Sequence, residues 1–305
     1  GWDYPVAMWP DGNASFARLQ VASLIPGVAD NVTADNVAMA QFDYDALDRP
    51  DSPVRLRLNA TAIHAQNTAD GSAVDYVQDG TVYRVQAKHC VLACYHAIIP
   101  HLCPTLPETQ REALSYQVKR PLLLTNVLIR NSRALDKLGI DAVTCPGRMH
   151  ARLFMFKGIN NGGYTHDIND HDGPVPLVFW GSISPPPEVH HVKDQHRASR
   201  AIMLSLKFED YEREVRTVLH GLLGPAGFDV KRDVLAITVN RWPHGYAYDY
   251  LDLWDDDWPE GEAPHEIARQ PFGNIVMANA DAAADAYTHA AIDQAYRAVG
   301  ELQKG

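Results

Sequence analysis

The residues best suited to chemistry lie between Asn240 and Trp258, directly after a run of strand-forming residues. This stretch contains Trp242, His244, Tyr246, Tyr248, Tyr250, Trp254 and Trp258. Aromatic faces line slots for planar cofactors and form cages around cationic amines. A packed aromatic corner with hydrogen-bonded hydroxyl groups is the alternative interpretation. These residues alone do not decide between the two.

The end of the chain forms a second candidate, in which a short strand, a polar loop and a helix follow one another. Ile275 to Met277 form an apolar run, and Asn279 and Asp281 follow it. From Ala291 to Leu302 apolar residues recur at steps of three and four, which predicts one face of a helix. The free N–H groups and the dipole at the start of such a helix favour an anionic or electron-rich ring. An ordinary strand–helix connection is the alternative and the more common arrangement.

Other catalytic and metal-binding patterns find little support. His190, His191 and His196 lack an H-E-x-x-H motif and a further ligand at useful spacing, so we expect loop histidines and no metal site. Residues 255–257 are three aspartates without the remainder of a calcium-binding loop, which predicts a solvated acidic turn. The sequence also contains no G-x-S-x-G, no G-x-x-x-x-G-K-[ST] and no G-x-G-x-x-G motif.

The composition is that of a soluble globular chain with an acidic balance. The 305 residues carry a net charge of −11 and no basic run, which argues against nucleic acid and anionic membranes as partners. The acidic balance mildly favours a small cationic substrate, although a solvated acidic surface is the more common explanation. No apolar run approaches the roughly 20 residues of a membrane span. The cysteines, of which none form C-x-x-C, are expected to be buried thiols.

The first third of the chain predicts a helix followed by a small sheet. Residues 14–19 form a helix capped by Asp11 or Asn13. Residues 54–63 alternate and predict a strand with one buried face. Residues 74–85, with a turn at Asp79–Gly80, predict a hairpin, and residues 88–94 a fully buried strand.

The middle of the chain predicts a second sheet covered by a helix. Strands are expected at residues 121–129, 152–156, 177–180 and 233–239, a long loop at 160–176, and a helix at 208–222 that ends at Gly224–Pro225. This block is the predicted substrate domain, residues 113–240. Residues 1–112 and 241–305 are the predicted remainder of a nucleotide-binding domain.

Together these residues resemble the C-terminal two-thirds of a flavin-dependent amine oxidoreductase of the monoamine and polyamine oxidase superfamily, in particular bacterial spermidine-dehydrogenase-like flavoproteins. The likeness spans the chain. Four segments carry it most specifically: residues 9–15, 88–95, 239–246 and 290–295. The resemblance implies a mixed α/β fold with two domains, the flavin amine oxidase fold, here without its N-terminal Rossmann βαβ turn.

The resemblance also assigns residues to the site, position by position. Ala62 matches a strand that meets the adenine, and Trp242 matches a tryptophan beside the flavin. Asn279 and Asp281 fall next to the cofactor's phosphates and ribityl chain, where Asn replaces the family's Gly. Tyr287 matches an aromatic-cage position, and the Thr288 N–H matches a donor to the flavin. The other residues expected at the reaction centre or on the substrate side are His244, Tyr246, Tyr248, Gly12, Asn13 and Ser15.

The implied reaction removes a hydride from the carbon beside a neutral amine, and the resulting imine is hydrolysed. Many members of the superfamily carry a lysine that holds a water near the flavin. The matching strand here reads Leu124–Thr125–Asn126, so that lysine is absent. The resemblance therefore favours a dehydrogenase that passes electrons to another acceptor. The sequence specifies neither that acceptor nor an additional haem.

The chain has no phosphate-binding turn of its own, and its first residue is Gly1. We expect FAD to be shared with a second polypeptide that supplies the G-x-G-x-x-G segment, or with an N-terminal segment absent from this sequence. The isolated chain is then expected to bind no flavin. A non-catalytic binding or scaffold subunit derived from the same fold is the competing function. The compartment, bacterial cytoplasm or periplasm, is not fixed by the sequence.

Overall fold

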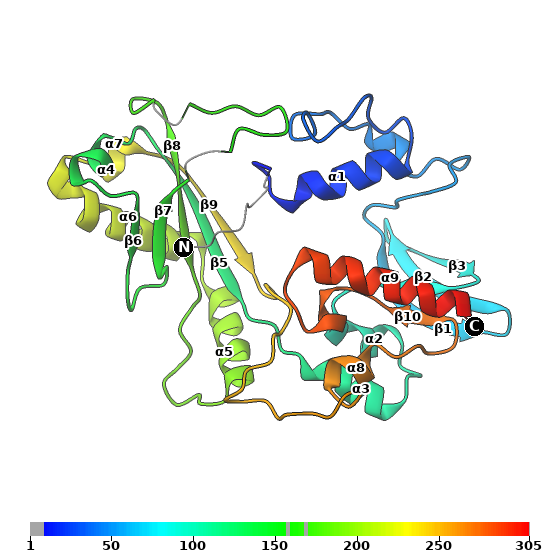
Figure 1. The fold of residues 1–305 in the computed structure, drawn as a ribbon. Helices are drawn as coiled ribbons and strands as arrows, with labels where there is room; N and C mark the ends of the chain where they lie inside the picture. Colours follow the sequence, from blue (N-terminus) through cyan, green and yellow to red (C-terminus); the bar gives the residue numbers. More distant parts are fainter. Residues whose placement is uncertain (1–8, 157–158, 168–169, 305) are drawn as a thin grey trace.

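The computed structural model describes residues 9–156, 159–167 and 170–304. Three parts are visible in Figure 1. The five-stranded body holds residues 121–242, the two-sheet body holds residues 61–116 and 264–304, and the α1 lobe holds residues 9–60. The mixed helix-and-sheet class expected from the sequence is confirmed. The domain boundaries stay a prediction.

The five-stranded body is an antiparallel sheet with strand order β6-β7-β8-β5-β9. Its strands are β5 (Leu122–Ile129), β6 (Ala142–Thr144), β7 (Arg152–Met155), β8 (Val175–Gly181) and β9 (Val234–Trp242). Its helices are α4 (Arg133–Leu138), α5 (Val192–Ser205), α6 (Phe208–Leu223) and α7 (Val230–Asp233). The four predicted strands and the helix at 208–222 are thus present with shifted ends. The sequence analysis missed β6, α4 and α5.

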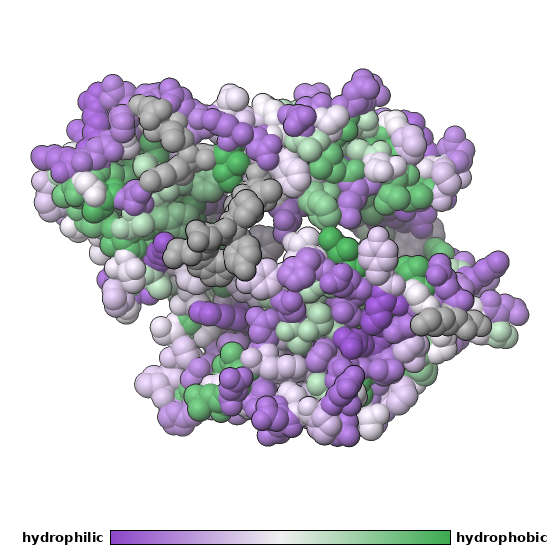
Figure 2. Space-filling model, in the orientation of Figure 1, coloured by the Kyte–Doolittle hydropathy of each residue, from purple (hydrophilic) through white to green (hydrophobic). Residues whose placement is uncertain are grey.

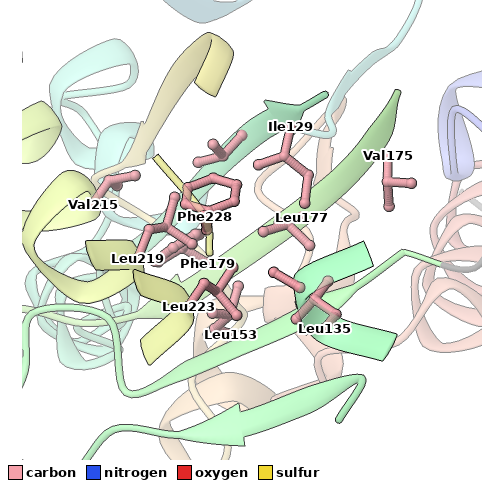
Figure 3. Close-up of a cluster of buried hydrophobic side chains, with 12 residues drawn as sticks. Ile129, Leu135, Leu153, Val175, Leu177, Phe179, Val215, Leu219, Leu223 and Phe228 are labelled. Carbon is pink, nitrogen blue, oxygen red and sulfur yellow. The ribbon is translucent and has the colours of Figure 1, made fainter. Parts of the chain in front are cut away.

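The core of this body lies between one face of the sheet and α6. Along β8, Leu177 and Phe179 are fully buried, because alternate residues of a strand face the same side. On α6, Val215, Leu219 and Leu223 recur at steps of four and meet them (Figure 3). The spacing of apolar residues along β8 and α6 therefore explains this packing.

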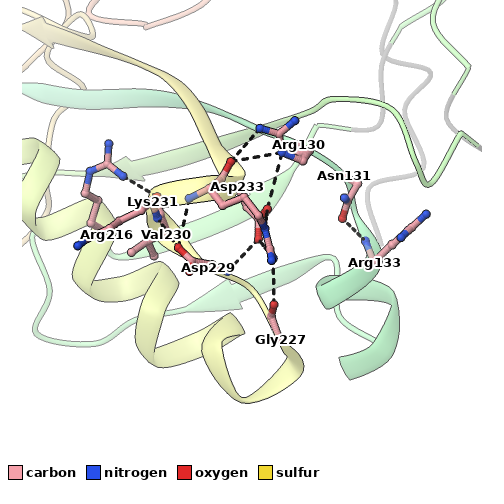
Figure 4. A network of polar contacts seen from close by, with 10 residues as sticks. Arg130, Asn131, Arg133, Arg216, Gly227, Asp229, Val230, Lys231 and Asp233 are labelled. Atoms are coloured by element: carbon pink, nitrogen blue, oxygen red, sulfur yellow. Dashed lines mark hydrogen bonds and ion pairs between the residues drawn. The ribbon is translucent and has the colours of Figure 1, made fainter.

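A polar network fixes the start of β9 (Figure 4). Asp229 caps α7 by accepting the backbone N–H groups of Lys231 and Arg232. The buried carboxylate of Asp233 pairs with Arg232 at 2.7 Å and with Arg130 at 3.8 Å. The hydrogen bonds from Arg232 lower the pKa of Asp233 against the opposing effect of burial.

The two-sheet body combines an antiparallel meander with a short parallel pair. The meander is β1 (Thr61–Thr68), β2 (Gly71–Gln78) and β3 (Thr81–Ala87), and the parallel pair is β4 (Cys90–Leu92) and β10 (Ile275–Met277). The helices around them are α2 (Ile99–Leu102), α3 (Glu108–Tyr116), α8 (Pro264–Ala268) and α9 (Thr288–Lys304). The predicted hairpin at 74–85, the strand at 275–277 and the C-terminal helix are confirmed.

Two strand predictions in this region are wrong. The predicted strand at 54–63 is replaced by β1, which begins only at Thr61, since residues 54–58 have no neighbouring strand to pair with in the described structure. The predicted fully buried strand at 88–94 is the three-residue β4, and its central Val91 is 42% exposed. Parallel strands are normally covered on both faces, so the exposure of Val91 is unusual.

The α1 lobe contains α1 (Asn13–Leu24) and then loops. The residue that precedes the helix is Gly12, at a φ of 66°, and no side chain caps the helix, so the prediction that Asp11 or Asn13 does so is wrong. The carboxylate of Asp11 instead accepts the hydroxyl of the buried Ser15 at 2.5 Å. The long loop predicted at 160–176 is confirmed for residues 160–167 and 170–174, while residues 168–169 lie outside the described ranges and β8 begins at Val175. Gly162 packs closely against Trp9 and Ala38.

Candidate functional site

The start of α1 joins the five-stranded body to the C-terminal helix. Asp11 lines a cavity of about 540 Å³ together with Leu128 and Pro176 of the sheet. Two residues later, the side-chain amide of Asn13 donates a hydrogen bond to the hydroxyl of Thr288 at 3.1 Å. These two groups lie 275 positions apart in the sequence, yet both belong to the expected site. The structure therefore brings the expected substrate-side segment to the expected cofactor-side helix.

The register of the sheet places Trp242 on the face that borders this cavity. Leu128 pairs with Pro176, and Leu122 pairs with Trp242. Cross-strand partners and residues two apart share a face, so Trp242 lies on the same side as Leu128. The opposite face packs on α6. The sheet thus presents a face of mixed polarity, with Leu124, Asn126 and Leu128 on β5 and Trp242 at the end of β9.

Two aromatic side chains expected beside the flavin are strongly exposed. Trp242 is 53% exposed and Tyr287 is 57% exposed, and the ring of Tyr287 stacks on His289 with the centroids 5.7 Å apart. Thr288 is the first residue of α9, where backbone N–H groups have no acceptor within the helix. Exposed aromatic faces beside a helix N-terminus suit a planar, electron-rich ligand.

The loop between β10 and α9 has a strained backbone at Asn279. Its φ of 99° and ψ of 158° fall in a region used almost only by glycine. The Asn279 side chain accepts the Asp281 N–H at 3.2 Å and donates to the Ala93 carbonyl at 3.4 Å. The chain therefore holds here a conformation that glycine adopts more readily, and strain of this kind concentrates at ligand sites.

The carboxylate of Asp281 is fully buried and is already engaged by the protein. One oxygen pairs with the ammonium of Lys119 at 2.8 Å, and the other accepts the backbone N–H of His96 at 3.0 Å. Burial lowers the pKa of His96 to about 4, so its imidazole is neutral at pH 7. Asp281 consequently ties three segments together, and its expected contact with a cofactor stays a prediction. No motif or spacing in the sequence pointed to Lys119.

Arg200 ties the turn after β9 to the backbone of Lys119. The guanidinium of Arg200 donates to the carbonyl oxygens of Pro243 at 2.7 Å and Lys119 at 2.8 Å. The ring of His244 lies 4.7 Å from the ring of Tyr95, over which the Lys119 ammonium also lies. Partial burial and the charges of Arg200 and Lys119 lower the pKa of His244. Its imidazole is therefore held in the neutral form that accepts protons.

Tyr248 belongs to a packed aromatic corner. Its hydroxyl and that of Tyr116 each donate to the carboxylate of Asp255 at 2.7 Å. The ammonium of Lys193 lies 3.5 Å from that carboxylate and 3.0 Å from the centre of the Tyr116 ring. Burial and the bond to Asp255 raise the pKa of Tyr248. A cation of the chain itself thus occupies this corner. The prediction of a solvated acidic turn is wrong for Asp255, whose side chain is 2% exposed.

A smaller pocket of about 180 Å³ lies beside this corner. Tyr246, Tyr248 and Asp249 line it together with Arg120 and His196. Partial burial and the nearby charge of Asp285 raise the pKa of Asp249, and a backbone contact with Ala286 opposes this shift. The charge of Asp285, in the loop that leads into Tyr287, thus acts on Asp249. The sequence analysis did not select Asp249 or Asp285, because an acidic residue in a loop carries no motif.

The remaining expected site residues are placed as follows. Ala62 is exposed in β1 opposite Tyr76, and Ser15 is buried against Asp11. His191 accepts the Lys193 N–H at the start of α5, and the ring of His196 contacts the Val118 carbonyl. Within the described ranges, no group of three His, Cys, Asp or Glu side chains is arranged to hold a metal ion. Cys103 is buried, the other three cysteines are partly buried, and all four are free thiols.

The surface is hollowed between the α1 lobe and the part of the two-sheet body that carries α9, and hydrophobic residues border the hollow (Figure 2). In the part of the chain that the structure describes, no helix combines the length and the apolar character needed to cross a membrane.

Neither protein-family models nor curated protein sequences gave a match to this chain. Solved structures did match. A putrescine oxidase variant has a TM-score of 0.54 at 18% identity, over 84% of this chain and 50% of its own. A wild-type putrescine oxidase bound to putrescine has a TM-score of 0.51 at 16% identity, over 81% of this chain and 49% of its own. Cyclohexylamine oxidase from Brevibacterium oxydans IH-35A has a TM-score of 0.50 at 12% identity, over 80% of this chain and 48% of its own.

These comparisons establish the fold. The architecture is that of part of the flavin amine oxidase fold, as expected from the sequence. The chain spans about half the length of the solved structures that it matches.

Proposed function

We propose that this chain is part of an FAD-dependent amine oxidoreductase that oxidises a C–N bond by hydride transfer. The observation that carries the proposal is the hydrogen bond between Asn13 and Thr288. Asn13 lies two residues after Asp11, which lines the cavity on the sheet face, so this bond ties the segment beside that cavity to the N-terminus of α9. The fold shared with putrescine oxidase and cyclohexylamine oxidase supports the same reaction class.

The residues present fit the ring end of FAD. Thr288 begins a 17-residue helix whose first N–H groups and dipole suit the negative charge of a reduced ring. The strained backbone at Asn279 holds the preceding loop in a conformation that glycine normally supplies. The Asp281 carboxylate does not fit a direct role, because Lys119 and His96 engage both of its oxygens.

FAD, when bound, supplies the acceptor for a hydride from the carbon beside a neutral amine, and water then hydrolyses the imine. The chain's own residues prepare the substrate for this reaction. Trp242 and Tyr287 offer aromatic faces that orient the amine. His244, whose pKa is lowered by partial burial and by the charges of Arg200 and Lys119, is a further proposed residue of the reaction centre. Asp249 and Asp285 contribute negative charge that attracts a small cationic amine, with a polyamine such as spermidine as the proposed class.

A second polypeptide that carries the G-x-G-x-x-G segment completes the FAD site in this proposal. The strand expected to carry the superfamily lysine has Leu124 and Asn126 on the cavity face, and Thr125 points to the other side against His150. Without that lysine the enzyme is proposed to act as a dehydrogenase that passes electrons to a carrier.

Native mass spectrometry of the complex purified from its source tests the proposal. We expect a second polypeptide and the mass of one FAD, followed by amine-dependent reduction of the flavin. A chain that copurifies with neither a dinucleotide-binding segment nor FAD would contradict it. Tight FAD binding by residues 1–305 alone would contradict the shared site.

A matched pair of tyrosine variants at and within α9 separates catalysis from a scaffold role. Tyr287→Ala, directly before α9, should lower kcat/KM for the amine by roughly tenfold, because an aromatic face that orients the substrate is lost. Tyr296→Ala removes another exposed tyrosine, nine positions later within α9, and should change kcat/KM by less than about twofold. Equal effects of the two variants would favour the non-catalytic scaffold.

A further inference from the structure

The turn after β9 carries His244 just beyond the last paired residue of the sheet. Trp242 pairs with Leu122 and is therefore held by the register of β5 and β9. His244 follows two residues later, after the end of the strand. Among the described residues, no hydrogen bond reaches either nitrogen of its imidazole ring. The sheet therefore does not fix the place of this ring.

Arg200, on α5, holds the turn with a single guanidinium group. Its Nε–H donates to the Pro243 carbonyl at 2.7 Å, and its Nη2–H donates to the Lys119 carbonyl at 2.8 Å. A guanidinium presents its donors in a rigid planar fork, so binding two acceptors at once fixes the distance between the segments that carry them. Arg200 therefore clamps the residue before His244 to the segment that enters β5.

A second contact holds the other side of the turn. The N–H of Gly245 donates to the Arg120 carbonyl at 2.8 Å. A Cβ at Gly245 would lie 2.6 Å from Cγ of Leu122 and 2.9 Å from the Arg120 carbonyl oxygen, so a larger residue would push this backbone away. His244 thus lies between two backbone contacts with the same segment, and one of them depends on the Arg200 side chain.

Arg200 also contributes charge beside the His244 ring. That ring lies 4.7 Å from the Tyr95 ring, over which the Lys119 ammonium lies. Partial burial lowers the pKa of His244, the positive charges of Arg200 and Lys119 lower it further, and the charge of Asp281 opposes them. Burial also lowers the pKa of Arg200, which still stays protonated near neutral pH. Arg200 therefore acts on the imidazole both through the backbone and through its charge.

We infer that Arg200 is the positioning residue that holds the His244 imidazole beside Tyr95 at the proposed reaction centre. This inference rests on the proposed function, which places His244 there. Arg200 acts through two backbone carbonyl groups and not through contact with the substrate. Because the turn is fixed through its main chain, both ring nitrogens of His244 are left for the substrate amine.

A double-mutant cycle in the complete, FAD-loaded protein tests this role, with spermidine as the amine. Arg200→Gln should lower kcat/KM by roughly tenfold, but by less than about twofold when His244→Gln is already present, because a residue that acts through His244 loses its effect without it. Arg197→Gln is the matched control on α5, where Arg197 is exposed and pairs with Asp194, and it should change kcat/KM by less than about twofold. A full loss in both backgrounds, or an equal loss from Arg197→Gln, would overturn the inference.

Two NMR measurements need no turnover and separate position from charge. Arg200→Gln should raise the pH midpoint at which His244 titrates, since a nearby positive charge is lost, and should speed hydrogen exchange of the Gly245 amide by roughly tenfold or more. Arg200→Lys keeps the charge but not the planar fork. It should therefore leave the midpoint near that of the unaltered protein and still speed the exchange. Unchanged exchange of the Gly245 amide in Arg200→Gln would overturn the inference.

The unaltered protein provides a further check if the variants fail to fold. The Nε proton of Arg200 should exchange slowly there, because it is bound to the Pro243 carbonyl, and rapid exchange would overturn the inference. A lack of amine-dependent flavin reduction in the unaltered protein would instead contradict the proposed function. The NMR measurements would then still decide whether Arg200 holds the turn that carries His244.

Discussion

The five-stranded body and the two-sheet body are held together in different ways. In the first, one sheet face and α6 enclose a contiguous apolar core that includes Leu177, Phe179 and Leu219. The second has an apolar cluster of its own, which includes Ile99, Leu114 and Ile275, and polar ties across long sequence separations supplement it. Gln110 donates to the Ala268 and Gln270 carbonyl groups, and Asp281 pairs with Lys119, which lies just outside this body. The same part of the molecule exposes Val91.

This difference indicates which part of the molecule offers surface for contacts with a ligand or another protein. In the five-stranded body, α6 already covers one face of the sheet with apolar side chains. A part that combines buried charges with exposed strand edges is suited to contacts with something else, and the candidate flavin residues Tyr287 and Thr288 lie there. Trp242, the last residue of β9, lies in the five-stranded body. Four experiments test this contrast between the two bodies.

Lys119→Met should lower the free energy of unfolding by about 3–5 kcal/mol, because it leaves the buried carboxylate of Asp281 without its cation. Urea denaturation measures the loss. Lys137→Met, at an exposed position of α4, is the control and should change stability by less than about 0.5 kcal/mol. Adding Asp281→Asn should restore part of the loss. A neutral effect of Lys119→Met would show that polar ties do not hold the two-sheet body.

Leu219→Ala should cost about 3 kcal/mol, because it opens a cavity in the core of the five-stranded body. The same denaturation experiment measures it, with Leu204→Ala as the exposed control on α5. If the loss stays below about 1 kcal/mol, the core between α6 and the sheet is looser than the burial of Leu219 implies.

Lowering the pH from 6.5 to 5 should destabilise both bodies, by about 2 kcal/mol for each of two buried histidines. Burial lowers the pKa of His96 and of His150 from 6.5 to about 4. Between these values the unfolded chain binds the additional proton and the folded chain does not, so stability falls as the pH falls. His150→Gln should remove the slope from the five-stranded body and His96→Gln from the two-sheet body. Denaturation at pH 7 and pH 5 measures how the free energy of unfolding depends on pH. An unchanged dependence in both variants would refute this prediction.

Arg130→Ala should cost at most about 1 kcal/mol, because the Arg130 side chain is half exposed and its partner keeps a closer cation. Asp233 retains its bonds to Arg232. Thermal unfolding at low and high salt measures the effect, which should shrink as salt screens the pair. A larger loss would mean that the network at the start of β9 acts as one unit.

The sequence predicted those helices and strands that are specified by the pattern of apolar residues within the element itself. The period of α6, the alternation of β2 and β3 around Asp79–Gly80 and the apolar runs of β5 and β10 specify those elements, since side-chain burial repeats with the backbone period. The strand predicted at 54–63 failed for the opposite reason. Its alternation is present, but a strand also needs a neighbour to pair with, and no neighbouring strand pairs with residues 54–58 in the described structure.

The candidate site divides in the same way. Residue types and the family resemblance were enough to select Asn13, Trp242, Tyr287 and Thr288. The three-dimensional contacts were needed to show that Asn13 meets Thr288, that Tyr248 and Asp255 belong to a corner filled by Lys193, and that Lys119 neutralises Asp281. These contacts join segments far apart in the chain, and their energies depend on distance and burial, which local residue spacing does not encode.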